Sequence, residues 1–186
     1  RVRKGRYLFT FFINISAGVG GKCSMEGKRL TSYAMEELEC PKCGHKHSLK
    51  KYKVINVTEK AKLKEEIMKN RLYQFSCEEC EYMAPLTYDS LYVDSQRNIM
   101  IYMAPVMNAE IKAEIAELEQ EKGIDKRLVD NINDLKEKIM IVDNHLDDRV
   151  IEIIKIMYLD QIKKEMEDDT LLNILFDYNR DNYCFL

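Results

Sequence analysis

The sequence has few of the residues, and none of the short motifs, on which enzyme active sites are commonly built. It contains only three histidines and seven glycines, and it has no tryptophan. The patterns G-x-S-x-G and H-E-x-x-H are missing, and so are the phosphate-binding loop and the glycine pattern of dinucleotide-binding folds. No nucleophile or general base can be named, so we expect a protein that is not an enzyme. An unrecognised enzyme is the less favoured alternative.

The chain also lacks the marks of a large or membrane-spanning protein. Its 186 residues, of which 46% are hydrophobic, suffice for one globular core and a small additional unit, but not for a second large domain. The apolar stretch near the N-terminus, residues 7–13, is too short to span a bilayer. We therefore predict no membrane span.

Acidic side chains outnumber basic ones outside the N-terminus. Residues 1–34 carry seven of the 29 basic side chains and one of the 32 acidic ones, so the remainder has 22 basic and 31 acidic side chains, a net charge of −9. Such an acidic body is a poor ligand for a polyanion. The best basic patch surrounds Tyr52 and consists of Lys42, Lys46, Lys50, Lys51 and Lys53. A nucleic-acid-binding zinc ribbon is therefore the alternative function, but it is disfavoured.

Four of the six cysteines form two C-x-x-C pairs, which 33 residues separate. The pairs are Cys40 with Cys43 and Cys77 with Cys80. A tight turn with this spacing points both sulfurs to one side, so each pair can supply half of a tetrahedral site. Four thiolates are the ligand set of a closed structural zinc site, and we predict that zinc binds these four cysteines.

Two other interpretations of the pairs stay open. One is a dithiol redox function, which favours a single C-x-x-C at the start of a helix in a β-α-β unit. The other is a set of unrelated reduced cysteines. Unpaired or metal-bound thiols are typical of a reducing compartment, so we expect a cytoplasmic protein in which Cys23 and Cys184 are free thiols.

Several segments around the pairs resemble the bacterial CpXC family. These segments are Cys40-Pro41-Lys42-Cys43, Ile55-Asn56-Val57-Thr58, Leu72-Tyr73-Gln74-Phe75, Leu91-Tyr92-Val93-Asp94, Ile99-Met100-Ile101-Tyr102 and the run from Leu146 to Glu152. The resemblance covers about residues 36 to 166, although the second pair lacks the proline. It implies a protein built around its cysteines that has no established reaction, so it gives no biological task.

The sequence predicts an α+β fold in three parts. Residues 1–34 are expected to be an unstructured or non-native leader, with a signal or anchor as the alternative, and the folded body would start near Met35. Residues 35–107 are predicted to form a zinc-ribbon-like pair of knuckles with a small antiparallel sheet and a helical insert. Residues 108–186 are predicted to be a helical region that ends in a β-hairpin, and we expect this hairpin to be truncated.

Within these parts, strands are expected at residues 49–57, 72–76, 83–86, 90–93 and 99–106, and helices at 59–70, 109–122 and 130–139. Thr58 is the expected N-cap of the helical insert. A further helix begins at Asp147 or Asp148, and its segment 150–162 is so apolar that it should be buried nearly all round. That segment packs in the core or, as the alternative, against a second copy or another protein partner.

The three histidines are weak candidates for chemistry. His45 and His47 flank the first pair and could replace a weak ligand, although histidines on a solvated turn are more often bystanders. His145 lies among Asp143, Asp147 and Asp148, where a carboxylate metal or acid-base site is conceivable. A helix-capping loop explains these residues better.

Overall fold

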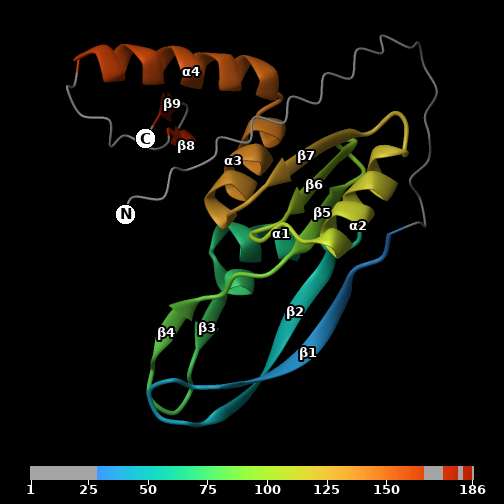
Figure 1. Ribbon diagram of the computed structural model, residues 1–186, viewed down its shortest axis with the longest axis vertical. Coiled ribbons are helices and arrows are strands. Elements are labelled where there is room, and N and C mark those ends of the chain that lie inside the picture. Colours follow the sequence, from blue (N-terminus) through green and yellow to red (C-terminus); the bar gives the residue numbers. More distant parts are fainter. Residues whose placement is uncertain (1–28, 166–173, 180–181, 186) are drawn as a thin grey trace.

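The computed structural model describes residues 29–165, 174–179 and 182–185, and it shows a mixed α+β fold (Figure 1). A five-stranded sheet has the order β1-β2-β5-β6-β7. Its strands are β1 (Ser32–Glu39), β2 (Lys46–Asn56), β5 (Ser90–Asp94), β6 (Ile99–Met103) and β7 (Asp125–Val129). Pairing is antiparallel for β1 with β2 and for β5 with β6, and parallel for β2 with β5 and for β6 with β7.

Two separate hairpins and four helices complete the described part of the fold. The hairpins are β3 (Gln74–Ser76) with β4 (Met83–Pro85) and β8 (Phe176–Asn179) with β9 (Asn182–Phe185). The helices are α1 (Lys62–Met68), α2 (Ala109–Glu119), α3 (Ile132–Asp143) and α4 (Asp148–Glu165), and a 3-10 turn, η1, covers Arg71–Tyr73. No helix in this part of the chain is both long enough and apolar enough to cross a membrane.

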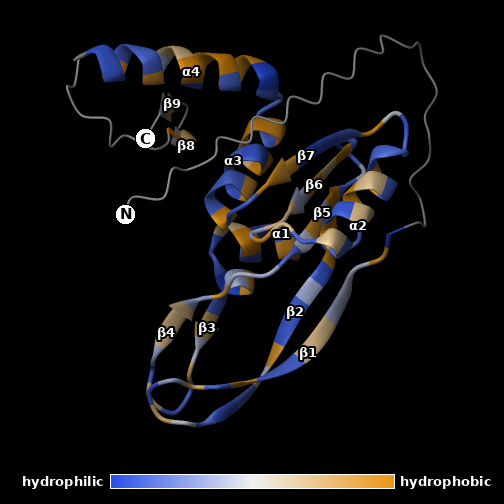
Figure 2. Ribbon diagram, in the orientation of Figure 1, coloured by the Kyte–Doolittle hydropathy of each residue, from blue (hydrophilic) through white to orange (hydrophobic). Residues whose placement is uncertain are grey.

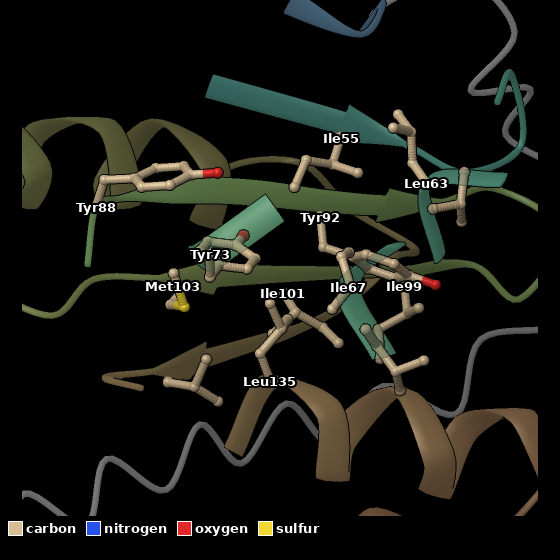
Figure 3. Packing of buried hydrophobic residues seen from close by; sticks show 13 residues of the cluster. Ile55, Leu63, Ile67, Tyr73, Tyr88, Tyr92, Ile99, Ile101, Met103 and Leu135 are labelled. Carbon is tan, nitrogen blue, oxygen red and sulfur yellow. The ribbon is translucent and has the colours of Figure 1, made fainter. Parts of the chain in front are cut away.

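The sheet is covered on both faces, which explains why every residue of β5 and β6 is buried. Alternate residues of these strands point to opposite faces. On one face, Tyr92, Ile99 and Ile101 pack with residues of α1 and α3, as Figure 3 shows. On the other face, Val93 and Met100 pack under α2. The two layers form the core of the body.

Strand β2 runs from this core to a projecting arm. Its end at Val54–Asn56 pairs with β5, whereas the part before it pairs only with β1. Strand β1 is exposed along nearly its whole length. The β1–β2 arm and the β3–β4 hairpin both extend away from the body, and their turns meet at the same end of the molecule (Figure 1). Each of these two turns carries one C-x-x-C pair.

The fold confirms the predicted α+β class, the helical insert between the knuckles and the terminal hairpin. Two predicted boundaries need correction. The boundary between residues 34 and 35 falls inside β1, and Asn56 donates a side-chain hydrogen bond of 2.8 Å to the Arg29 carbonyl, so residues 29–34 belong to the fold. The boundary at 107/108 separates β7 from the sheet that it joins. Residues 1–28 of the predicted leader and residues 166–173, 180–181 and 186 of the predicted C-terminal region lie outside the described residues.

Helix α4 is not buried all round, contrary to the prediction. Its buried side includes Ile151 and Lys155, whereas Val150, Ile153 and Met157 are exposed. Figure 2 shows the mixture of hydrophobic and hydrophilic residues along this helix.

Candidate metal centre

The first knuckle is the turn between β1 and β2. The N–H group of Cys40 donates to the carbonyl of His45 across 2.8 Å, and the N–H group of Gly44 donates to the carbonyl of Cys40 across 2.9 Å. Gly44 has a φ of 73°, in the left-handed region that glycine adopts without strain. These bonds close the turn and hold both sulfurs on one side.

The second knuckle, between β3 and β4, repeats this backbone pattern. The N–H group of Cys77 donates to the carbonyl of Tyr82 across 2.8 Å, and the N–H group of Glu81 donates to the carbonyl of Cys77 across 3.0 Å. Glu81 occupies the position of Gly44 and has a φ of 57°. The two turns therefore have the same construction, but the second places a glutamate where the backbone favours glycine.

The four cysteine sulfurs form one cluster, within which all lie at most 4.8 Å from one another. Cys40 Sγ lies 3.6 Å from Cys80 Sγ, and Cys43 Sγ lies 3.5 Å from Cys77 Sγ. These distances exceed the S–S bond of about 2.05 Å, so the thiols are reduced. A tetrahedral site with Zn–S bonds of about 2.3 Å places its sulfurs about 3.8 Å apart. The cluster thus has the dimensions of a four-thiolate metal site.

The cluster closes a small apolar centre of its own. Cys40 and Cys77 are buried together with Phe75, whereas Cys80 is half-buried and Cys43 is exposed. Leu38 and Leu49 of the first arm pack against these residues. The few apolar residues of this cluster suggest that a bound ion would supply much of the stability of the two arms.

The thiols of the cluster differ in acidity. Burial raises the pKa of Cys40, but hydrogen bonds from the backbone N–H groups of Lys42 and Cys43 and from neighbouring thiols outweigh it, and the pKa falls to about 7. For Cys43, a hydrogen bond from the His45 backbone acts to lower the pKa, yet partial desolvation of the sulfur and the neighbouring thiols raise it to about 12. A divalent cation would favour the thiolate form of all four groups.

Two of the lysines beside the cluster face acidic residues of the adjacent strand. Across the β1–β2 arm, Lys46 lies opposite Glu39, and Lys51 forms an ion pair of 2.6 Å with Glu36. Lys50 lies over the ring of Tyr33, 4.4 Å from its centroid. Within the predicted basic patch, Lys51 is therefore neutralised by an ion pair, and Lys46 has an acidic residue across from it.

His145 and the aspartates around it do not form a common site. His145 is exposed at a left-handed position where α3 ends. Asp143 pairs with Lys64 and Arg97 at 2.8 Å. The other two aspartates, Asp147 and Asp148, pair with other cations. Asp147 Oδ1 also accepts a hydrogen bond of 2.9 Å from the Arg149 N–H group at the start of α4, which supports the interpretation as a helix-capping loop.

Sequence reasoning weighed His47 as a substitute ligand but favoured a bystander role, and it missed a second feature altogether. His47 Nε2 lies 3.2 Å from Cys77 Sγ, a contact that the alternation of β2 could have suggested, because His47 shares its face with Leu49. The second feature is a buried ion-pair network between α3 and α4. Its charged residues are Glu137, Lys138, Asp148, Glu152 and Lys155.

Replacement of Glu81 by glycine is expected to stabilise the protein by up to about 1 kcal/mol, because it relieves the left-handed backbone strain of a residue with a Cβ atom. The change also removes a negative charge beside the thiols. Thermal melting measures the effect. As a control, Glu79→Gly removes an equally exposed charge from the same turn without relief of a positive φ, and it should not stabilise. Equal melting temperatures for Glu81→Gly and Glu79→Gly would contradict the claim that the backbone at Glu81 is strained.

Comparison with known proteins gives one family. The model of the CpXC family, described as "CpXC protein", matches residues 38–155, which is more than half of the chain. The matched region contains all four clustered cysteines, the central sheet from its second strand on, and the first part of α4. No curated protein and no solved structure matches the chain significantly.

Proposed function

The chain belongs to the CpXC family, and we propose that it is a binding or scaffold protein whose two arms are held together by a structural zinc ion. The observation that carries this proposal is the cluster of the four sulfurs of Cys40, Cys43, Cys77 and Cys80. Four protein thiolates fill the tetrahedral coordination of zinc and leave no position for water or substrate. The ion would therefore act as a crosslink.

The donor set favours zinc over harder cations. Thiolates are soft ligands that select zinc or iron among the common metals in tetrahedral sites, whereas magnesium and calcium require oxygen ligands. Four reduced thiols also persist best in a reducing compartment, which supports a cytoplasmic location.

Elemental analysis of the purified protein tests the metal. We expect about one zinc per chain, and no zinc after all four clustered cysteines are changed to serine. Cys184→Ser is the matched control, because Cys184 is a free thiol outside the cluster. A full zinc content in the variant without the four cysteines would overturn the site, and stoichiometric iron in the wild type would overturn the choice of metal.

A non-enzymatic role is supported by the closed donor set and by the separate ion pairs around His145. A role in nucleic-acid binding is less well supported, since Glu36 pairs with Lys51 and Glu39 lies opposite Lys46. The proposed task is therefore to present a surface to a protein partner.

The exposed side of α4 is the surface that we propose for self-association. Val150, Ile153 and Met157 lie at helical spacing on the side opposite the buried Ile151 and Lys155. Ile153 is 54% exposed and Met157 is 65% exposed. Pairing with the same helix of a second copy would bury this stripe against an identical stripe.

The double variant Ile153→Lys/Met157→Lys should shift the protein from dimer to monomer, because four lysines would meet at a two-fold interface. Sedimentation equilibrium measures the mass. Val106→Lys/Met107→Lys adds the same charge at two exposed apolar residues outside α4 and should leave the dimer intact. A wild-type protein that stays monomeric at high concentration would sink this proposal.

A further inference from the structure

His47 lies beside the sulfur cluster, although it belongs to neither C-x-x-C pair. Its Nε2 atom is 3.2 Å from Cys77 Sγ, so the first arm reaches a cysteine of the second knuckle. A metal-bound thiolate has no proton to donate, so the imidazole must donate this hydrogen bond through Nε2–H. We propose that His47 is a positioning residue that stabilises the Cys77 thiolate and slows release of the ion, a role that rests on the proposed metal centre.

The ring of His47 is held in place from two sides. It meets the buried ring of Phe75 edge-on, with centroids 5.3 Å apart and an interplanar angle of 80°. The ring of His45 lies 4.8 Å away on the first arm. In the strand register, His47 is directly opposite Leu38, whose side chain packs into the same small cluster. The hydrogen bond is thus preorganised by packing.

The repeated construction of the two knuckles makes His47 distinctive. His47 follows Cys40 by seven residues, and the residue seven positions after Cys77 is Ala84, which has no side-chain donor. Only the first arm can therefore supply an imidazole to the opposite knuckle. This asymmetry matters because four thiolates around a divalent cation carry two surplus negative charges. Glu78, Glu79 and Glu81 add more negative charge on the same side as Cys77.

A hydrogen bond donated to a thiolate delocalises part of the surplus negative charge of the site and increases its affinity for the metal. Outer partners of metal ligands commonly change metal affinity about 10-fold to 100-fold when they are removed. Lys42 Nζ donates to the Cys80 carbonyl at 3.4 Å rather than to a sulfur. Among the described side chains near the cluster, His47 is the one with a ring nitrogen within hydrogen-bond distance of a cysteine sulfur.

The test compares zinc transfer to a chromogenic chelator in the wild type, His47→Phe and His45→Phe. His47→Phe keeps an aromatic ring against Phe75 but has no donor, and it should release zinc about 10-fold faster. His45→Phe makes the same exchange at the neighbouring histidine, keeps an aromatic ring beside His47, and should match the wild type. His47→Gln retains an N–H donor and should recover part of the slow release.

A second readout separates the hydrogen bond from packing. In the cobalt-substituted protein, loss of the donor should raise the energy of the sulfur electrons and move the thiolate-to-cobalt charge-transfer band to longer wavelength for His47→Phe but not for His45→Phe. A zinc-loaded His47→Phe protein with wild-type release and an unmoved band would overturn this proposal alone. A wild-type protein that binds no zinc would instead overturn the metal centre, and this proposal with it.

Discussion

A Cys40→Ser chain is expected to lose its metal and the order of both arms, while the body around β5 and β6 stays folded. Metal binding and folding are coupled in small structural zinc sites, where the ion contributes on the order of 10 kcal/mol. The arms have only a small apolar cluster of their own, centred on Cys40, Phe75 and Cys77. The body has two larger clusters on the faces of the sheet, and these do not depend on the sulfurs.

Hydrogen exchange followed by mass spectrometry distinguishes the two parts of the chain. Amides of β3 and β4 should exchange rapidly in Cys40→Ser, whereas those of β6 should remain protected. Cys184→Ser should exchange like the wild type in both regions. Wild-type protection of β3 and β4 in Cys40→Ser would show that the arms do not rely on the ion. Loss of protection in β6 would show that the body also relies on the ion.

An Asp148→Asn chain is expected to be about 2 kcal/mol less stable than the wild type, because Lys138 keeps its ion pair with Glu152 but loses the charged hydrogen bond to Asp148, and Arg127 loses its carboxylate. Asp148 accepts a hydrogen bond of 2.6 Å from Lys138 and a further ion-paired bond from Arg127. Both Asp148 and Lys138 are buried. Urea denaturation measures the change. The adjacent Asp147 is exposed and pairs only locally with Arg149, so Asp147→Asn should cost about 0.5 kcal/mol or less.

The effect of Asp148 should depend on pH. Burial acts to raise the pKa of this carboxyl group, but the charge of Lys138 and the hydrogen bonds from Lys138 and Arg127 overcome it, so the pKa lies below its ordinary value. The stabilisation is complete above the ordinary value of about 4 and is lost as the pH falls through the folded pKa. The free energies of unfolding of the wild type and Asp148→Asn should therefore converge in acid. A constant difference down to low pH would contradict the ion pair.

The parts of the fold that were predictable from sequence are those whose local pattern matches their environment. Ile99 to Met103 is apolar at every position and forms a strand buried on both faces. The cysteine spacing predicted the cluster because a C-x-x-C turn determines its own geometry. In contrast, Thr58 was expected to cap α1, but its hydroxyl oxygen accepts a hydrogen bond from the Ser95 N–H group and α1 begins at Lys62.

The elements that were missed depend on partners distant in sequence. Strand β1 is rich in glutamate and exposed, so it is a strand because it pairs with β2 and not because it buries a face. Strand β7 begins with Asp125, Lys126 and Arg127, and only its parallel pairing with β6 makes it extended. Neither strand shows the hydrophobic periodicity on which sequence reasoning relies.

The prediction for helix α4 was wrong for a different reason. Its isoleucines suggested burial all round, yet the side that contacts α3 includes Lys155, which forms an ion pair of 2.9 Å with the buried Glu137. Glu137 also accepts a hydrogen bond of 2.6 Å from the N–H group of Phe176. The rotation of the helix is thus determined by a charged contact that hydrophobicity does not reveal.

The joining of the two knuckles also changes the thermodynamics of the unfolded chain. Residues 44–76, between Cys43 and Cys77, form a loop that a shared ion would close, and a link of this length lowers the conformational entropy of an unfolded chain by the equivalent of about 4 kcal/mol. The middle of that loop supplies Ile55, Leu63 and Ile67 to the main core. An ion bound before folding would therefore reduce the number of conformations through which these three side chains reach the sheet. It would do so even though the ion is bound at the end of the arms farthest from the sheet.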